Sequence, residues 1–128
     1  MKSIVVINFE FEQSADLHSF LNATICLRKA QLLECLDNYN REIGNAINEY
    51  LYCYFAKELE PDDFEYFGSS GVAVFALDAC AGCLNVTVLT KDQFFRTLFE
   101  ALHNHRQNFS DDEWAMIQNK LHQLLSVG

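Results

Sequence analysis

The spacing of hydrophobic residues changes several times along the chain, and each change predicts a new element. Residues 3–12 end in strict alternation, which is typical of a strand with one face in water. From Ser14 the apolar residues recur at helical spacing, which predicts a first helix with Ser14 or Asp16 as its cap. Residues 72–77 and 84–90 are apolar and rich in β-forming residues, so they predict an antiparallel hairpin.

The longest helical signal covers residues 28–59. Gly44 lies inside it and costs a helix about 1 kcal/mol relative to alanine, so it marks a weak point. Pro61 is expected to end the helix, because proline disfavours helical backbone in the preceding residue. The apolar residues that follow one another at steps of three and four, and so share one helical stripe, are Leu32, Leu36, Tyr39, Ile43, Ile47, Tyr50 and Tyr54.

Two capping boxes open the last two predicted helices. Thr90 is followed three residues later by Gln93, and Ser110 by Glu113, a pattern whose reciprocal hydrogen bonds specify a helix start. The element order therefore predicts an α+β fold: a small antiparallel sheet of about three strands, packed with four or so helices including one long helix. At 128 residues, the chain is expected to form one domain, residues 1–128.

Composition narrows the classes of partner. The chain is 50% hydrophobic, which excludes intrinsic disorder, and its 18 acidic and 9 basic residues give a net charge of -9. Such a charge repels the phosphates of nucleic acid and of anionic membranes, so neither is expected as a direct ligand. No apolar run reaches the ~20 residues of a membrane-spanning helix and no export signal is recognisable, so we expect a cytoplasmic protein.

The five cysteines favour reduced thiols, because an odd number without an export signal argues against a disulfide framework. Cys80 and Cys83 have the spacing of half a zinc site. The other half is missing, since His103 and His105 would project about 200° apart on a helix. We interpret this segment as a hairpin turn in which Gly82 supplies a positive φ, with metal or redox roles as open alternatives.

The chain also lacks the short motifs that carry chemistry. It contains no nucleophile elbow, zinc-protease motif, P-loop or dinucleotide fingerprint, and its four histidines are scattered. We therefore expect a protein that is not an enzyme, with no catalytic residues, no metal and no cofactor.

The negative charge is concentrated in residues 58–67. This segment holds five acidic residues and no basic one, so it contributes -5 of the net -9. Phe64, Tyr66 and Phe67 are interleaved with the carboxylates. Carboxylates attract a cationic partner and pair with arginine, while aromatic rings supply desolvated contact area, so the segment predicts a recognition surface for a basic protein. The alternative is a solvated loop with Phe64 and Phe67 packed under the sheet.

A polar ridge on the predicted long helix extends this surface. Glu42, Asn45, Glu49 and Tyr52 follow one another at steps of three, four and three, on the face away from the apolar stripe. The residues that we expect to bind a partner are Glu49, Tyr52, Glu58, Glu60, Asp62, Asp63, Phe64, Glu65 and Tyr66.

In size, acidity and element order, the chain resembles bacterial immunity proteins, the antitoxins of contact-dependent inhibition and related polymorphic toxin systems. Residues 14–21, which follow a predicted strand, are similar to the opening of barstar-type ribonuclease inhibitors, although the aromatic-glycine-asparagine signature of that family is absent. The resemblance implies a protein, expected to be monomeric, that neutralises a basic toxin, expected to be a nuclease, by occluding its active-site cleft. The alternative function is an acidic secretion chaperone or adaptor that binds an effector protein, typically as a dimer.

Overall fold

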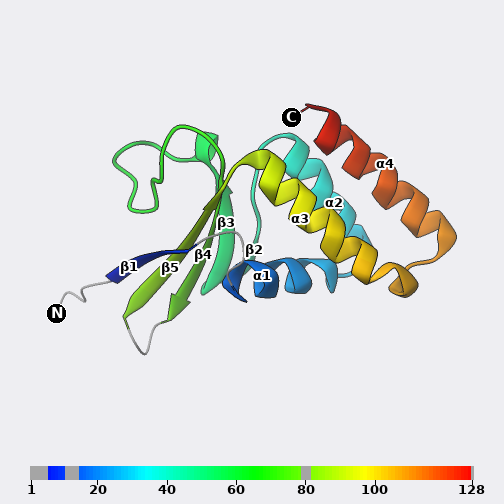
Figure 1. Ribbon diagram of the computed structural model, residues 1–128, viewed down its shortest axis with the longest axis horizontal. Coiled ribbons are helices and arrows are strands. Elements are labelled where there is room, and N and C mark those ends of the chain that lie inside the picture. The colour runs from blue at the N-terminus through cyan, green and yellow to red at the C-terminus, as the bar shows by residue number, and fades with distance from the viewer. Residues whose placement is uncertain (1–5, 11–14, 79–81, 128) are drawn as a thin grey trace.

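The arrangement of helices and strands confirms the predicted α+β class (Figure 1). The computed structural model describes residues 6–10, 15–78 and 82–127. Its elements, in chain order, are β1 (Val6–Glu10), α1 (Ala15–Ile25), α2 (Lys29–Asn40), β2 (Ala46–Asn48), β3 (Leu51–Phe55), the 3-10 turn η1 (Ala56–Glu58), β4 (Val72–Asp78), β5 (Cys83–Leu89), α3 (Lys91–Asn104), the 3-10 turn η2 (Arg106–Asn108) and α4 (Asp111–Val127).

The sheet has five strands rather than about three, in the order β1-β5-β4-β3-β2. Strands β5, β4, β3 and β2 pair with one another in antiparallel order and include the predicted hairpin of β4 and β5. Strand β1 confirms the expected N-terminal strand but joins the edge of β5 in parallel. Residues 3–5 and 11–12 of the expected strand and the proposed cap Ser14 lie outside the described residues, and Asp16 lies in the first turn of α1.

The predicted long helix over residues 28–59 is wrong. Helix α2 ends at Asn40, and the backbone N–H groups of Arg41 and Ile43 both donate to the Asn38 carbonyl at 2.9 Å. Glu42 then turns the chain with a φ of 59°, and two strands follow. No helix therefore reaches Pro61, which lies in a turn after η1.

The main core lies between one face of the sheet and the helices. Tyr39 of α2 is buried there, with its ring 5.4 Å from Phe94 of α3 and 5.9 Å from Phe55 of β3. Cys53 and Phe55 point into the same core, and Leu51 packs against it. Helix α4 packs against α2 and α3, where Lys120 and Asp37 form an ion pair at 2.6 Å. In Figure 1 all four helices lie to one side of the sheet.

Both capping boxes are confirmed by reciprocal hydrogen bonds. The Gln93 N–H donates to Thr90 Oγ1 at 3.1 Å, and the Thr90 N–H donates to Gln93 Oε1 at 2.9 Å. The corresponding distances for Ser110 and Glu113 are 3.1 Å and 2.8 Å. Because each box satisfies backbone donors that the helix leaves free, the sequence pattern alone specifies these two helix starts.

The β4–β5 turn and the cysteines are described only in part. Gly82 has the expected positive φ, 66°, whereas Cys80 lies outside the described residues. Within the described ranges, no group of three or more His, Cys, Asp or Glu side chains is placed to hold a metal ion. None of the helices in those ranges has the length and apolar character needed to span a membrane.

Candidate partner-binding surface

The face of the sheet away from the helices carries aromatic rings. Tyr52 and Tyr54 of β3 point to this face, opposite to Cys53 and Phe55, because side chains alternate along a strand. The Tyr52 ring stacks on Phe75 of β4 at 5.1 Å and an interplanar angle of 10°. Tyr54 lies edge-on to both rings, at 5.7 Å from Tyr52 and 5.9 Å from Phe75. The result is a fixed aromatic surface on the side of the sheet that the helices leave uncovered.

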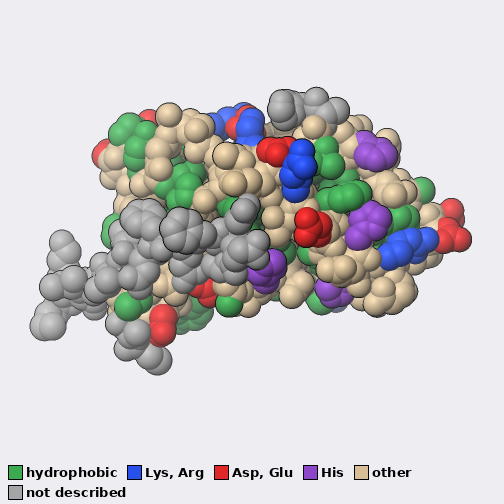
Figure 2. Space-filling model, viewed as in Figure 1, with side chains coloured by type: hydrophobic (Ala, Val, Ile, Leu, Met, Phe, Trp, Pro, Cys, Tyr) green, Lys and Arg blue, Asp and Glu red, His purple; other side chains and the backbone are tan. Residues whose placement is uncertain are grey.

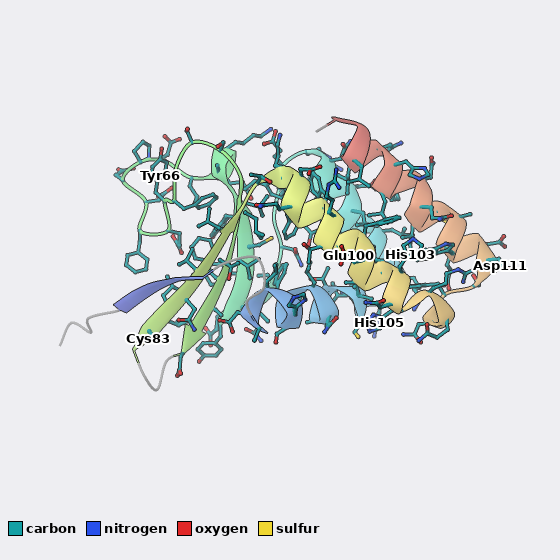
Figure 3. All side chains as sticks on the ribbon, viewed as in Figure 1. Tyr66, Cys83, Glu100, His103, His105 and Asp111 are labelled. Atoms are coloured by element: carbon teal, nitrogen blue, oxygen red, sulfur yellow. The ribbon has the colours of Figure 1, made fainter. Side chains whose placement is uncertain are left out.

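Residues 59–71, here called the acidic loop, cover part of this face. Phe67 is half-buried and its ring lies 6.3 Å from Phe75. This residue therefore packs against the sheet, as expected from the alternative interpretation of the loop. Phe64, in contrast, is 60% exposed, and Tyr66 is 37% exposed. Figure 3 shows Tyr66 at the end of the molecule away from the helices. The loop is therefore anchored by one aromatic residue and presents two others to solvent.

The carboxylates of this region have two different roles. Asp63 Oδ2 accepts the Glu60 N–H at 2.7 Å and so shapes the loop. Glu58 is half-buried, and its Oε1 accepts the N–H groups of Gly44 at 2.8 Å and of Phe55 at 2.9 Å. Glu60 and Asp62 are exposed. Asp63 and Glu58 thus hold the backbone, whereas Glu60 and Asp62 leave their charge facing the solvent.

A pocket of about 450 Å³, here called the hairpin pocket, opens between the β2–β3 hairpin and the acidic loop. Its lining residues are Gly44, Asn45, Ala46, Asn48, Glu49, Tyr52, Cys53, Tyr54 and Glu65. The sequence placed Asn45, Glu49 and Tyr52 on a helical ridge, and that ridge does not exist because no helix runs there. The three residues nevertheless meet in this pocket, whereas Glu42 forms an ion pair with Lys91 at 3.6 Å.

Negative charge is concentrated in the strands as well as in the acidic loop. Residues 42–90, which include β2 to β5 and the acidic loop, contain eight acidic residues and one basic residue, Lys57, so their net charge is 1 minus 8, or -7, of the total of -9. In Figure 2 acidic side chains are visible at both ends of the molecule, whereas the visible Lys and Arg side chains lie toward the helices. The strands and the loop form a strongly acidic half of the molecule.

The surroundings of the tyrosines in the hairpin pocket favour the protonated phenol. The Tyr52 hydroxyl donates to Glu65 Oε2 at 3.4 Å. Burial, followed by the charge and hydrogen bond of Glu65, raises the pKa of Tyr52 to about 12. Burial and the same carboxylate also raise the pKa of Tyr54. Both rings therefore line the pocket as neutral groups beside negative charge.

The structure divides the expected binding residues among three places. Glu49, Tyr52 and Glu65 line the hairpin pocket; Glu60, Asp62, Asp63, Phe64 and Tyr66 belong to the acidic loop; and Glu58 supports the backbone between them. Sequence reasoning missed Tyr54 and Asn48 as pocket residues. The alternation in residues 51–55, Leu-Tyr-Cys-Tyr-Phe, is the signal that identifies a strand with tyrosines on one face.

Comparison with known proteins gives one family. The family model described as CDI immunity protein matches residues 14–119, a range that spans both the hairpin pocket and the acidic loop. No curated protein and no solved structure matches the chain.

Proposed function

The chain belongs to the CDI immunity protein family, and from this premise we propose that it neutralises a basic toxin domain, a nuclease, by covering the active-site cleft with its acidic half. Membership of the family makes the chain a toxin-neutralising protein whose partner is a cognate toxin. It also favours this function over the secretion chaperone that the acidity alone left open. The basic character of the toxin, its nuclease activity and the occlusion of its cleft are our proposal.

The observation that supports the proposal most directly is the segregation of charge. Residues 42–90 carry a net charge of -7, with Glu60 and Asp62 exposed in the acidic loop. A nuclease has to bind phosphates, and therefore presents a positive cleft. An opposed negative surface accelerates encounter with such a cleft, and its carboxylates pair with the side chains that otherwise hold substrate phosphates.

Exposed aromatic side chains supply the contact area that charge alone does not. Phe64 and Tyr66 project from the acidic loop, and Tyr50, in the turn between β2 and β3, is 46% exposed. Large aromatic residues at the centre of an interface account for much of its binding energy when a polar rim excludes water around them. We infer that Phe64 and Tyr66 are the apolar anchors, and that Glu60 and Asp62 form the rim.

Charge reversal at residues with no part in the fold tests this function. The double variant Glu60→Lys, Asp62→Lys should slow association with the cognate toxin domain tenfold or more at low salt and should reduce protection of cells that produce the toxin. The matched control is Glu34→Lys, Glu100→Lys, which makes the same change of charge at exposed positions on α2 and α3. Equal association rates for the two double variants would remove the acidic loop from the interface.

Occlusion of the cleft needs a separate experiment. An uncleavable oligonucleotide that fills the toxin's active site should compete with the immunity protein for the toxin domain. A ternary complex of toxin, oligonucleotide and immunity protein would show binding away from the active site and would contradict occlusion.

A further inference from the structure

The hairpin pocket offers a ligand mainly aromatic surface and carboxylates. The carbonyl oxygens of its two amide side chains already accept hydrogen bonds within the chain. Asn45 Oδ1 accepts the Tyr39 hydroxyl at 2.5 Å, and Asn45 Nδ2 donates to Thr24 Oγ1 at 3.4 Å. Asn48 Oδ1 accepts the Tyr50 N–H at 2.8 Å. The charged side chains of the pocket are Glu49 and Glu65. Glu49 interacts with the Tyr50 phenol and Glu65 accepts the Tyr52 hydroxyl, and each carboxylate has further lone pairs to offer a ligand.

The aromatic wall of the pocket is held in place by its own packing. One face of the Tyr52 ring is covered by Phe75, and the Tyr54 ring lies at 76° to that of Tyr52. The Tyr52 hydroxyl is tied to Glu65 at 3.4 Å. A wall that is rigid before binding loses little conformational entropy on binding. Tyrosine faces attract cations, and the attraction increases as the cation is desolvated.

The charge of the pocket has one sign. Glu49 comes from the β2–β3 turn and Glu65 from the acidic loop, and no lysine or arginine is among the lining residues. Among the ion pairs of the described residues, none involves either carboxylate. Two carboxylates without a cationic partner, next to neutral phenols, complement a positively charged group from outside the chain.

We infer that the hairpin pocket receives the guanidinium group of one arginine of the bound partner, stacked on the tyrosine wall and paired with Glu49 and Glu65. A guanidinium fits better than an ammonium because it is planar, is more weakly hydrated, and donates hydrogen bonds in a fork that matches a carboxylate. That the arginine belongs to a toxin domain rests on the proposed function. The recognition of a guanidinium depends only on the pocket.

A small-molecule probe tests the recognition without the toxin. Nα-acetyl-L-arginine methylamide is added to isotope-labelled protein at constant ionic strength, and NMR shifts are followed for residues 44–54 and Glu65. We expect saturable shifts in these residues, with a dissociation constant on the order of 10 mM, as for a single weak contact. The lysine analogue should bind about three times more weakly, and the citrulline analogue, which has the shape without the charge, should produce no saturable shift.

Variants assign the binding to the pocket. Glu49→Gln and Glu65→Gln should each weaken binding of the arginine probe about threefold or more, and the double variant should abolish it. Tyr52→Leu should also weaken binding, whereas Tyr52→Phe, which keeps the ring, should retain most of it. Glu60→Gln is the matched control outside the pocket and should leave binding unchanged. Unaltered spectra for α1, α3 and α4 establish that each variant is folded.

The outcomes separate this inference from the proposed function. Equal shifts with the citrulline analogue, undiminished binding to the Glu49→Gln, Glu65→Gln double variant, or shifts confined to residues outside the pocket would each overturn the arginine site. The neutralisation of toxin does not enter any of these measurements. If the probe fails while the immunity protein still protects cells and depends on Glu60 and Asp62, only the pocket is excluded; if the probe binds but no protection is seen, only the proposed function fails.

Discussion

The carboxylate of Glu58 holds the backbone of Gly44, whose N–H donates to Glu58 Oε1 at 2.8 Å. The same oxygen accepts the Phe55 N–H at 2.9 Å. One side chain thus joins the segment that enters β2 to the end of β3, and Gly44 forms part of the hairpin pocket. Glu58 is one of the residues that the sequence placed in the binding surface. Its contacts show that it fixes the backbone behind the pocket, and we propose that it supports the binding surface in this way.

Loss of the Glu58 carboxylate should therefore destabilise the fold. Glu58→Ala should lower the free energy of unfolding by about 2 kcal/mol, because two backbone donors lose a charged acceptor. Glu58→Gln retains a carbonyl oxygen and should cost less. Urea denaturation followed by circular dichroism measures both. Glu60→Ala, which removes an exposed carboxylate, should stay within about 0.5 kcal/mol of the original protein, and an equal loss at the two positions would contradict the role of Glu58.

Gly44→Ala should be destabilising for a different reason. A Cβ atom at this position would lie 2.1 Å from the carbonyl oxygen of Cys53 and 2.7 Å from its carbon, so the backbone of the hairpin has to move. We expect a loss of about 3 kcal/mol in the free energy of unfolding, the scale of an overpacked interior. Adding Cys53→Ala should not rescue stability, because the obstacle is backbone. Restored stability in the double variant would locate the conflict in the Cys53 side chain instead.

The capping box at the start of α4 can be tested by a matched pair of variants. Ser110→Ala removes the acceptor of the Glu113 N–H and should cost about 1 kcal/mol of unfolding free energy. Ser110→Asp supplies another capping oxygen and should stay within a few tenths of a kcal/mol of the original. Thermal or urea denaturation distinguishes the two, and equal stability of both variants would contradict a capping role for Ser110.

The pH dependence of Tyr52 has a defined direction. Burial and Glu65 raise the pKa of Tyr52 to about 12, above the ordinary value of 10 that applies in the unfolded chain. The folded state therefore favours the protonated phenol, so the stabilisation is fully present below pH 10 and is lost as the pH rises from 10 through 12. Titration of the tyrosine ring carbons by NMR should show Tyr52 unchanged at pH 10. Glu65→Gln should lower this pKa yet leave it above 10, since burial is the larger cause; a Tyr52 midpoint near 10 in the original protein would contradict this account.

Salt should slow capture of the toxin much more than it accelerates release. Between about 50 mM and 500 mM salt the screening length falls severalfold, so the association rate constant should drop tenfold or more while the dissociation rate changes little. The Glu60→Lys, Asp62→Lys variant should show a shallower dependence than the Glu34→Lys, Glu100→Lys control. Association that is independent of salt would exclude electrostatic steering by the acidic half.

Local signals in the sequence account for the elements that were predicted correctly. The capping boxes at Thr90 and Ser110, the hairpin with Gly82 in its turn, and the first helix each depend on contacts between residues close in the chain. The pairing of β1 with β5, which matches Val6 with Cys83, joins distant segments and leaves no local signal. Charge segregation, in contrast to this pairing, can be found from the sequence. The net charge of -7 in residues 42–90 can be counted before any fold is known.

The prediction of a long helix was wrong because the apolar spacing of three and four residues continues beyond the end of α2 into two strands. Leu32, Leu36 and Tyr39 share the buried face of α2, as helical spacing requires. Ile43 and Tyr50 continue the spacing, yet both are exposed, and Tyr54 faces away from the main core on β3. Beyond Asn40 the chain is extended instead, and alternate residues of β3 pack on the two faces of the sheet. Helical spacing persisted there by coincidence.

By itself, the sequence determined the α+β class, the helix starts that are capped by neighbouring residues, and the localisation of negative charge with aromatic residues. Only the tertiary structure decided which of those residues lie together. Glu49 and Glu65 lie on different connections. They line one pocket because the acidic loop packs on the face of the sheet to which the tyrosines of β3 point. The structure likewise shows Glu58 bonded to backbone, while Glu60 and Asp62 are exposed. The charge of a side chain is a property of the residue itself and can be read from the sequence. Which side chains surround it depends on packing between segments that are distant in the chain.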